Sequence, residues 1–376
     1  MDTITEVTVY TNGNANNIST WSNVPYFFTQ TLRSKGIKVN LVDLSTSRVL
    51  NKLYRVFPLY RLIYKKTTYG YFRSLIHFLD ARRRISNAIK KYPNSQLNIF
   101  LTFSFSSTGL TTKPSIQFCD WPYAYAINYF EKRNPDIFEK WSIAREDSQI
   151  EGTNLIFPLF PVVSNFMNDH YKNKNIYYLG NVINSLFTSN ESIILDKKIA
   201  STSLLFIGSK KYLEGAKLLV NAFAILKSEI PALTLNFIGL ATSDFDELPS
   251  GVNCYGYLDK GNEKDRALYY KILESAKVFI NTNPKWGAFS ATIEAMYFYT
   301  PVIVTPYNDF VNTFGHEIGF GYYCENSSLD LLCNNIKKIL NNKLYNDLCL
   351  NAHKSVKGFT WDNYIDKMLV KIKENL

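Results

Sequence analysis

The sequence is poor in the residues that build metal sites and disulfide frameworks. Its 376 residues include five cysteines and four histidines. The cysteines are odd in number, far apart and never spaced as Cys-x-x-Cys, which argues against a disulfide framework and a zinc site. Buried thiols are expected instead. The four histidines match no catalytic constellation, and we interpret them as ordinary surface or helix residues.

Long apolar runs are also missing. A membrane-spanning helix needs roughly 18 consecutive apolar residues, and the longest candidate, 154–163, is interrupted by Pro158 and Pro161. Near the N-terminus, Asp2 and Glu6 stand where a secretory signal carries Lys or Arg before an apolar stretch. We therefore expect a cytoplasmic protein.

The composition excludes disorder and fits two domains. Hydrophobic residues make up 46% of the chain and aromatic residues 15%. In a chain of this length, these are more apolar side chains than the core of one domain usually contains. The net charge of +10 is concentrated, because the segment from Arg48 to Lys91 holds twelve of the 42 basic residues and one of the 32 acidic residues. The rest of the chain is close to neutral, so the basicity belongs to one surface and to one kind of partner.

Hydrophobic periodicity predicts an alternation of strands and helices in the first half. A strand at Glu6–Thr11, a polar loop, a helix at Val24–Ser34 and a strand at Val39–Leu44 form one βαβ unit. Gly36 is expected to end the helix. Further strands are predicted at 97–103, 115–119 and 176–179, helices at 75–91, 123–129 and 136–151, and a polar linker at 188–198.

The second half repeats this alternation, which predicts a second parallel α/β domain. In such sheets ligands bind beyond the carboxyl ends of the strands, so two facing domains place one site in the cleft between them. Strands are predicted at 204–207, 233–238, 252–257, 278–282 and 301–305, and helices at 215–228, 265–275 and 290–298.

The segment 281–296 is the first candidate for chemistry, because it reads as a strand end, a Gly-containing loop and a helix start. Backbone N–H groups at such a helix favour phosphate, with Ser290, Ala291 and Thr292 nearest the first turn. Glu294, one turn further on, can accept hydrogen bonds from the vicinal hydroxyls of a ribose. A merely amphipathic helix is the alternative. A capping box explains Glu294 poorly, since Ala291 occupies the position that needs Ser or Thr.

The same segment, continued through Glu294-Ala295-Met296 to Pro301-Val302-Ile303, resembles the signature of the glycosyltransferase family 4 group with the GT-B fold. The resemblance extends over the C-terminal half and is weaker in the N-terminal half. Its other motifs are Phe206-Ile207-Gly208-Ser209 with Gly215, Asn236-Phe237-Ile238-Gly239, Tyr255-Gly256-Tyr257-Leu258-Asp259, Phe359-Thr360-Trp361 and Thr20-Trp21-Ser22-Asn23-Val24-Pro25-Tyr26-Phe27.

The resemblance implies an α/β fold of two Rossmann-like parallel-sheet domains facing a central cleft. It implies an acceptor-binding domain over 1–185, a nucleotide-sugar-binding domain over 186–358, and a C-terminal helix, 359–376, that packs back on the first domain. Retention of the anomeric configuration is also implied. The donor-binding residues would be Gly208, Lys210, Lys211, Tyr257, Leu258, Phe289, Ser290, Ala291, Thr292 and Glu294, and the acceptor loop would contain Gly13, Trp21, Ser22 and Asn23.

The chain departs from the family pattern at charged positions. Trp286 replaces the first of two glutamates, the second of which matches Glu294. Ser209 and Glu214 replace an Arg and a Lys of the first donor loop, where Lys210 and Lys211 stand nearby as a source of positive charge for the departing diphosphate or as a solvated loop. Separately, Tyr299 occupies the place of a helix-terminating glycine, at a local cost of about 1 kcal/mol.

Asp120 is the candidate catalytic residue of the first domain, together with Glu294 of the second. Many family members place a His after the strand that here ends at Cys119, and this sequence has Asp120 there. A carboxylate at a strand end can orient a hydroxyl of the acceptor or the donor sugar, or serve as a base. The alternative is a turn or helix cap before Tyr123, since Pro122 suits a first helical turn.

An Asp-x-Asp pair, Asp244 and Asp246, could in principle hold Mg²⁺ or Mn²⁺. About one such pair is expected by chance among seventeen aspartates, and this one lies in a predicted loop without a Gly-rich partner. We therefore predict no metal and no cofactor, with a nucleoside-diphosphate sugar as donor substrate.

In the basic segment, from Arg48 to Lys91, basic residues alternate with aromatic residues. This pattern favours binding to an anionic membrane surface. Arg82, Arg83 and Arg84 would contribute to it. Nucleic-acid binding and a solvated helical face remain as alternatives, of which nucleic acid is disfavoured.

These observations favour a metal-independent glycosyltransferase that acts on a saccharide or lipid-linked saccharide acceptor in surface polysaccharide assembly, at the inner face of the membrane. A non-catalytic nucleotide-sugar or saccharide binding protein, or a transferase acting on nucleic acid, is the alternative.

Overall fold

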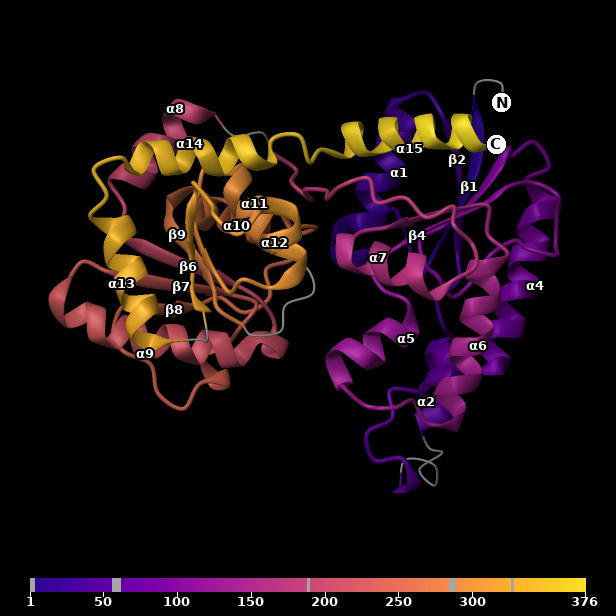
Figure 1. Ribbon diagram of the computed structural model, residues 1–376, viewed down its shortest axis with the longest axis horizontal. Coiled ribbons are helices and arrows are strands. Elements are labelled where there is room, and N and C mark those ends of the chain that lie inside the picture. Colours follow the sequence, from indigo (N-terminus) through magenta and orange to yellow (C-terminus); the bar gives the residue numbers. More distant parts are fainter. Residues whose placement is uncertain (1–3, 56–61, 188–189, 284–288, 326–327) are drawn as a thin grey trace. The chain divides into compact units, whose positions relative to one another are not determined.

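The computed structural model describes residues 4–55, 62–187, 190–283, 289–325 and 328–376. The chain divides into two compact units (Figure 1). Unit 1 comprises Met1–Asn181 together with Trp361–Leu376, and unit 2 comprises Val182–Thr360. The first boundary therefore lies at 181/182, where the sequence suggested 185/186. Hydrogen bonds hold the residues after this boundary to unit 2: the Ile183 N–H donates to the Phe359 carbonyl at 2.8 Å, and the Leu186 N–H donates to the Tyr270 hydroxyl at 3.0 Å.

Unit 1 is a five-stranded parallel sheet with the strand order β2-β1-β3-β4-β5. Tyr10 of β1 and Phe100 of β3 lie on neighbouring strands and stack at 4.4 Å between ring centroids in its core. The strands are β1 (Glu6–Thr11), β2 (Lys38–Asp43), β3 (Leu97–Phe100), β4 (Ser115–Cys119) and β5 (Leu155–Pro158). The helices are α1 (Val24–Ser34), α2 (Arg48–Arg55), α4 (Leu75–Lys91), α5 (Tyr123–Ala126), α6 (Ile137–Glu151), α7 (Pro161–His170) and α15 (Trp361–Asn375), with 3-10 turns at Thr20–Asn23 and Tyr71–Arg73 and a π turn at Ile127–Glu131.

The C-terminal helix α15 belongs to unit 1 although it follows unit 2 in the sequence. It packs beside α1, with the Trp361 ring edge-on to Phe28 at 6.0 Å and Tyr364 edge-on to Phe118 at 5.5 Å. Lys35 at the end of α1 pairs with Asp366 of α15 at 2.7 Å. The aromatic side chains that open α15 thus complete the core beside β4.

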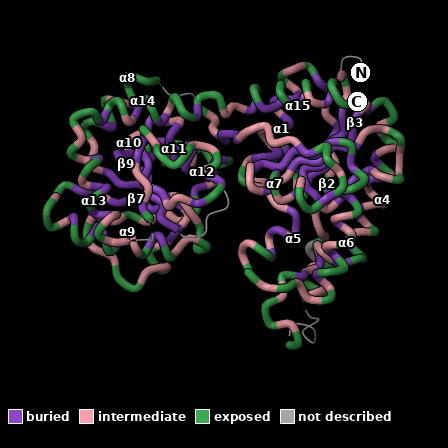
Figure 2. Tube along the Cα trace, in the orientation of Figure 1, coloured by how far each residue is buried: buried purple, intermediate pink, exposed green. Residues whose placement is uncertain are grey.

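Unit 2 is a six-stranded parallel sheet with the order β11-β10-β9-β6-β7-β8. Buried residues follow the strands of each unit (Figure 2), and the predicted α/β class with two parallel sheets is confirmed. The strands are β6 (Ser203–Ile207), β7 (Thr234–Ile238), β8 (Val252–Cys254), β9 (Ala276–Asn281), β10 (Val302–Val304) and β11 (Gly321–Tyr323). The helices are α8 (Glu191–Ile199), α9 (Leu213–Glu229), α10 (Glu263–Ser275), α11 (Ser290–Tyr297), α12 (Asn308–Phe314), α13 (Leu329–Leu340) and α14 (Tyr345–Val356), with 3-10 turns at Lys210–Tyr212 and Thr242–Asp244.

Two predicted elements are wrong. The strand expected at 176–179 is reduced to a single bridge between Ile176 and Ile156. Most of the expected linker at 188–198 is helix α8, whose Lys198 is fully buried. The Lys198 ammonium donates to the Leu273 carbonyl at 3.1 Å, the Ala276 carbonyl at 2.9 Å and the Thr300 hydroxyl at 2.7 Å. These three acceptors replace water around the ammonium, so a segment that looks polar in the sequence becomes part of the core.

Tyr299 adopts the left-handed backbone conformation that its glycine-like position predicts, with φ of 57°. Its ring stacks on His353 at 4.1 Å, and its hydroxyl donates to Glu191 at 3.1 Å. These contacts offset the backbone strain and join α11, α14 and α8.

Among the described residues, no helix combines the length and the apolar character that crossing a bilayer requires.

Candidate functional site

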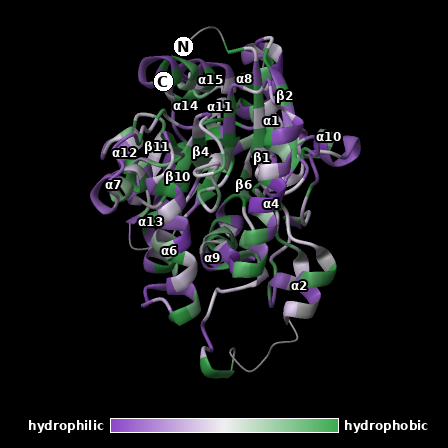
Figure 3. Ribbon diagram, turned by 90° about the vertical axis from the view of Figure 1, so that its right-hand side faces the viewer, coloured by the Kyte–Doolittle hydropathy of each residue, from purple (hydrophilic) through white to green (hydrophobic). Residues whose placement is uncertain are grey.

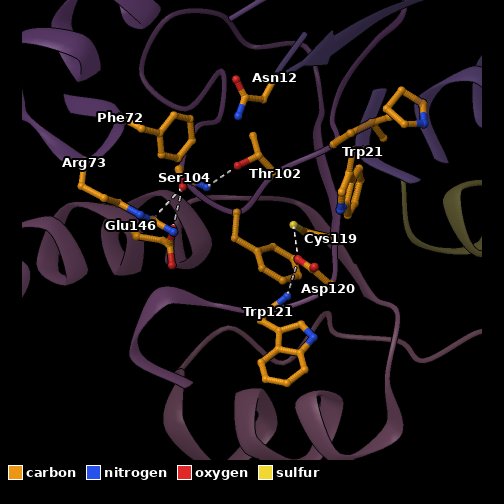
Figure 4. Close-up of a pocket in the computed structure, with 13 residues that line it drawn as sticks. Asn12, Trp21, Phe72, Arg73, Thr102, Ser104, Cys119, Asp120, Trp121 and Glu146 are labelled. Atoms are coloured by element: carbon orange, nitrogen blue, oxygen red, sulfur yellow. Dashed lines mark hydrogen bonds and ion pairs between the residues drawn. The ribbon is translucent and has the colours of Figure 1, made fainter. Parts of the chain in front are cut away.

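A pocket of about 210 Å³ lies in unit 1, where β1, β3 and β4 reach their carboxyl ends (Figure 4). Ligands of parallel sheets bind at this edge, because the loops that follow the strands gather there. The pocket is lined by Asn12, Trp21, Pro25, Phe72, Arg73, Leu101, Thr102, Phe103, Ser104, Cys119, Asp120, Trp121 and Glu146.

An arginine–carboxylate pair forms one wall of the pocket. Arg73 lies 2.5 Å from Glu146, and both side chains hydrogen-bond to the Ser104 hydroxyl, at 3.0 and 2.6 Å. The Arg73 guanidinium also covers the Tyr123 ring, 3.9 Å from its centroid, and the Tyr123 N–H donates to Glu146. These contacts hold Arg73 in one orientation, so the wall is preorganised.

The predicted catalytic residue Asp120 lines this pocket at the end of β4. Its Oδ1 accepts the Trp121 N–H at 2.9 Å and the Cys119 thiol at 3.1 Å. Burial and then the adjacent Asp120 carboxylate raise the pKa of Cys119, so this thiol stays protonated and is no nucleophile. Asp120 is not the N-cap of α5, because that position is Pro122, and the Tyr123 N–H at the start of the helix donates to Glu146.

The predicted acceptor loop lies beside the pocket in an unusual backbone conformation. Trp21, Ser22 and Asn23 have φ of 37°, 53° and 73°, values that non-glycine residues adopt only at a cost of about 1 to 2 kcal/mol each. Gly13 has φ of 112°, and a Cβ there would meet the Thr20 side chain at 3.0 Å. This backbone places the Trp21 side chain in the pocket wall (Figure 4).

A buried histidine lies behind the pocket, which the sequence did not predict. His77 is fully buried, and neither ring nitrogen has a hydrogen-bond partner among the described residues. The ring packs against Tyr71, Phe72 and Phe105 at 5.3 to 5.7 Å between centroids. Burial, and secondarily the charge of Arg84, lowers the pKa of His77 to about 4.

We predict that His77 weakens the fold in acid. Its pKa is about 6.5 in the unfolded chain and about 4 in the folded one, so stability is full above pH 6.5 and falls as the pH drops towards 4. The total loss is roughly 3 kcal/mol. In urea unfolding, His77→Phe should resemble the wild type at pH 7.5 and resist acid better below pH 6. A parallel loss of stability in both proteins between pH 6.5 and 4 would contradict this assignment.

Close backbone packing shapes the corresponding edge of unit 2. A Cβ on Gly215 would meet Asn283 at 2.9 Å, and the Gly215 N–H donates to the Asn283 Oδ1 at 3.0 Å. Gly239, with φ of 94°, would bring a Cβ to 2.5 Å from the Gly208 carbonyl. Glycine is therefore required at these positions, and the loops after β6, β7 and β9 touch one another at the carboxyl edge of the sheet.

Buried polar atoms without partners gather at this edge. Asn281 ends β9, Thr305 follows β10, and Thr292 lies in the first turn of α11. The Asn281 Nδ2 and the hydroxyls of Thr292 and Thr305 have no hydrogen-bond partner among the described residues, and Asn281 and Thr292 are 4% and 0% exposed. Each unsatisfied group costs about 1 to 3 kcal/mol, which a bound ligand can return.

Glu294 has internal partners that the sequence did not predict. The Lys260 ammonium lies 2.6 and 2.8 Å from its two carboxylate oxygens. The Tyr269 hydroxyl donates to Oε2 at 2.8 Å, and the Tyr270 hydroxyl lies 3.4 Å from Oε1. Glu294 is 4% exposed, and Lys260 also donates to the Asn184 carbonyl at 3.1 Å. A ribose would have to replace some of these donors, so its binding at Glu294 remains a prediction.

Two lysines near the first donor loop form ion pairs. Lys210 lies 2.5 Å from Asp244, and Lys217 lies 3.2 Å from Asp246, so both carboxylates of the Asp-x-Asp pair face ammonium groups. Among the described residues, no cluster of three His, Cys, Asp or Glu side chains could hold a metal ion. Lys211 follows Lys210 in the 3-10 turn before α9.

The remaining donor-site predictions fall around the start of α11 and after β8. Ser290 is exposed, Ala291 half-buried and Thr292 buried at the first turn of α11, while the Phe289 ring packs edge-on against Phe310 at 5.7 Å. Leu258 is buried, Tyr257 is exposed, and Gly208 is half-buried after β6. Trp286 lies outside the described residues.

The three consecutive arginines of the predicted anionic-surface site lie in different surroundings. Arg84 pairs with Asp80 and donates to the Ser45 carbonyl at 3.0 Å, and Arg82 is half-buried with contacts to the Thr108 carbonyl. Only Arg83 of the three is fully exposed. The neighbouring aromatic residues also turn inward, with Tyr71 4% exposed. The role predicted for these three arginines at an anionic surface stays a prediction, and Arg83 is the most accessible of them.

Comparison with known proteins identifies the region that carries the resemblance. Residues 201–342 match the family model described as Glycosyl transferases group 1. A search among curated proteins finds no significant match.

Solved structures share the fold over most of the chain at low sequence identity. Sucrose-phosphate synthase from Thermosynechococcus elongatus has a TM-score of 0.68 at 14% identity, over 98% of both chains. A glycosyltransferase from Rickettsia africae has a TM-score of 0.64 at 14% identity, over 100% of this chain and 99% of that one. Anabaena HepE, solved with UDP and glucose, has a TM-score of 0.61 at 11% identity, over 97% and 99%.

TarM is also similar, with a TM-score of 0.58 at 14% identity over 77% of this chain. The chain spans 58% of the length of TarM. The family-model match lies within unit 2, and these solved structures share the fold of the chain.

Proposed function

We propose that the chain transfers a sugar from a nucleoside diphosphate to a saccharide acceptor, with the donor at the carboxyl edge of unit 2. The observation that carries this proposal is the set of buried, unsatisfied polar atoms of Asn281, Thr292 and Thr305 at that edge. Phosphate and ribose oxygens can satisfy an amide and two hydroxyls there, beside the N-terminus of α11. UDP-sugars are the first donors to test, since HepE was solved with UDP.

The acceptor in this proposal binds in the unit 1 pocket. Trp21, Phe72 and Trp121 offer aromatic surfaces, while Asp120, Thr102 and Asn12 offer hydrogen-bonding groups. Aromatic faces beside polar groups suit a sugar ring, which has apolar C–H faces and a rim of hydroxyls. Asp120 would orient the reacting hydroxyl or remove its proton.

Metal independence is part of the proposal. Lys210 and Lys217 already neutralise Asp244 and Asp246, which leaves cationic side chains and the start of α11 to stabilise the departing diphosphate. We also propose that the anomeric configuration is retained and that the acceptor is a lipid-linked saccharide of surface polysaccharide assembly at the inner face of a membrane.

Sugar nucleotides screened by thermal shift and by release of nucleoside diphosphate test the proposal. We expect one donor to raise the melting temperature, because a ligand at about 100 times its Kd adds about 2.7 kcal/mol of stability. Release of diphosphate should persist in EDTA. Activity that EDTA abolishes and Mn²⁺ restores would overturn metal independence, and stabilisation without any turnover would indicate a binding protein instead.

A further inference from the structure

Large apolar side chains gather on the surface of unit 1 around the segment 62–79. Six of them form what we call the apolar rim: Leu62, Ile63, Leu75, Ile76, Leu79 and Trp141, each between 52 and 74% exposed. On α4, Leu75 and Leu79 are one turn apart and so lie on the same face of the helix, next to Ile76. Among the described residues, unit 2 has no comparable group of exposed apolar side chains so close in sequence.

Internal contacts order the part of this surface that carries Trp141. The Tyr69 ring packs on Phe138 of α6 at 5.5 Å, and the Phe138 ring packs edge-on to Trp141 at 5.5 Å. The buried Glu139 carboxylate accepts the Thr68 N–H at 2.7 Å and the Thr68 hydroxyl at 2.8 Å. The aromatic residues of the basic segment thus form an inner layer and leave aliphatic side chains outermost, where Figure 3 shows hydrophobic and hydrophilic residues interleaved along α2, α4 and α6.

Exposed basic residues flank each part of the rim. Lys65 and Lys66 follow Ile63, Arg83 lies one turn beyond Leu79, and Lys140 precedes Trp141. The one acidic residue between Arg48 and Lys91, Asp80, is paired with Arg84. The rim therefore presents apolar side chains and exposed basic side chains together.

We propose that the apolar rim docks on an anionic lipid bilayer, with the aliphatic side chains below the headgroups and the flanking bases at the phosphates. Apolar area and positive charge are the two contributions that hold a protein in the interface of a charged membrane. This inference deepens the proposed function and rests on it in one respect, the lipid-linked acceptor. Phe72 and Arg73 line the pocket and are separated from Leu75 and Ile76 by Ser74 alone, so a bound bilayer would lie next to the acceptor site.

The chemistry of the rim favours a bilayer over a nucleic acid. A duplex or single strand would be recognised by bases together with exposed aromatic faces, whereas Tyr69 and Tyr71 are 8% and 4% exposed. Five of the six rim side chains are aliphatic, and aliphatic groups gain most from acyl chains. Part of the binding free energy should therefore be lost at high salt, and part should remain.

Sedimentation with vesicles tests the inference on the full chain. We expect binding to phosphatidylglycerol–phosphatidylcholine vesicles, weak binding to phosphatidylcholine alone, and partial binding that survives high salt. The pair Leu75→Ser and Leu79→Ser should lower the partition coefficient about tenfold at both low and high salt. The pair Lys65→Gln and Lys66→Gln should lower it at low salt only. The pair Ile193→Ser and Ile225→Ser, at exposed positions of unit 2, is the matched control and should change nothing.

Tryptophan fluorescence gives a second readout. Addition of the anionic vesicles should shift the emission to the blue, and Trp141→Phe should remove most of this shift, because Trp141 is 56% exposed and would enter the interface.

The inference is overturned if the Leu75→Ser, Leu79→Ser variant binds vesicles as the wild type does, or if the unit 2 control loses as much. Binding of the wild type to RNA or DNA but not to vesicles would also overturn it. So would a wild-type dimer that does not bind vesicles and that the Leu75→Ser, Leu79→Ser substitutions dissociate. Release of diphosphate from the donor, measured on the same variants without vesicles, separates the two proposals. If a variant that does not bind vesicles still releases diphosphate, the proposed function stands.

Discussion

Replacement of Asp120 by Asn is expected to lower the rate of sugar transfer by about a hundred- to ten-thousand-fold, the range for loss of a general base or of a positioned carboxylate. Asn keeps the size of the side chain and an oxygen that can accept the Trp121 N–H, which now lies 2.9 Å from Oδ1. The pocket should therefore keep its shape. Transfer is measured with the donor found in the thermal-shift screen and a panel of short saccharides.

The matched control is Asp169→Asn, at an exposed position on α7 of the same unit. It should leave transfer unchanged. Thermal stabilisation by the donor should be equal in both variants, because the proposed donor site is built from unit 2. Transfer by Asp120→Asn within twofold of the wild-type rate would show that Asp120 serves the fold rather than the reaction.

The sequence predicted the strands and helices whose patterns are strong and local. Glu6–Thr11, Val24–Ser34, Leu75–Lys91 and Ser115–Cys119 have the predicted bounds, because alternating or helical spacing of apolar residues is decisive there. Helix α8 was missed because the burial of Lys198 depends on carbonyls of residues 273 and 276. Such partners cannot be seen in the local sequence.

The candidate site shows the same division. Asp120 and Trp21 could be predicted, because each stands near a strand end in a recognisable motif, and both line the pocket. Arg73 and Glu146 could not, because they are 73 residues apart and meet only when α6 packs beside the turn before α4. For the same reason, Lys260 could not be predicted from the motif that contains Glu294.

The buried pair of Lys260 and Glu294 should give the largest effect on stability. Lys260→Met leaves the Glu294 carboxylate buried without its counter-charge, and the loss of one partner of a buried pair costs about 3 to 5 kcal/mol. The side chains of this pair are 9% and 5% exposed, so water replaces little of the lost interaction. Urea unfolding measures the free energy directly.

The double variant Lys260→Met with Glu294→Gln separates folding from ligand binding. It removes both charges, so most of the stability lost in the single variant should return, with Tyr269 still hydrogen-bonded at 2.8 Å from the position of Oε2. Nucleotide affinity is then compared between the two variants by calorimetry. If Glu294 holds the ribose, the double variant should bind more weakly by about 1 to 3 kcal/mol. Equal affinity would show that the Glu294 carboxylate serves the fold alone, and a double variant as unstable as Lys260→Met would contradict the assignment of the pair.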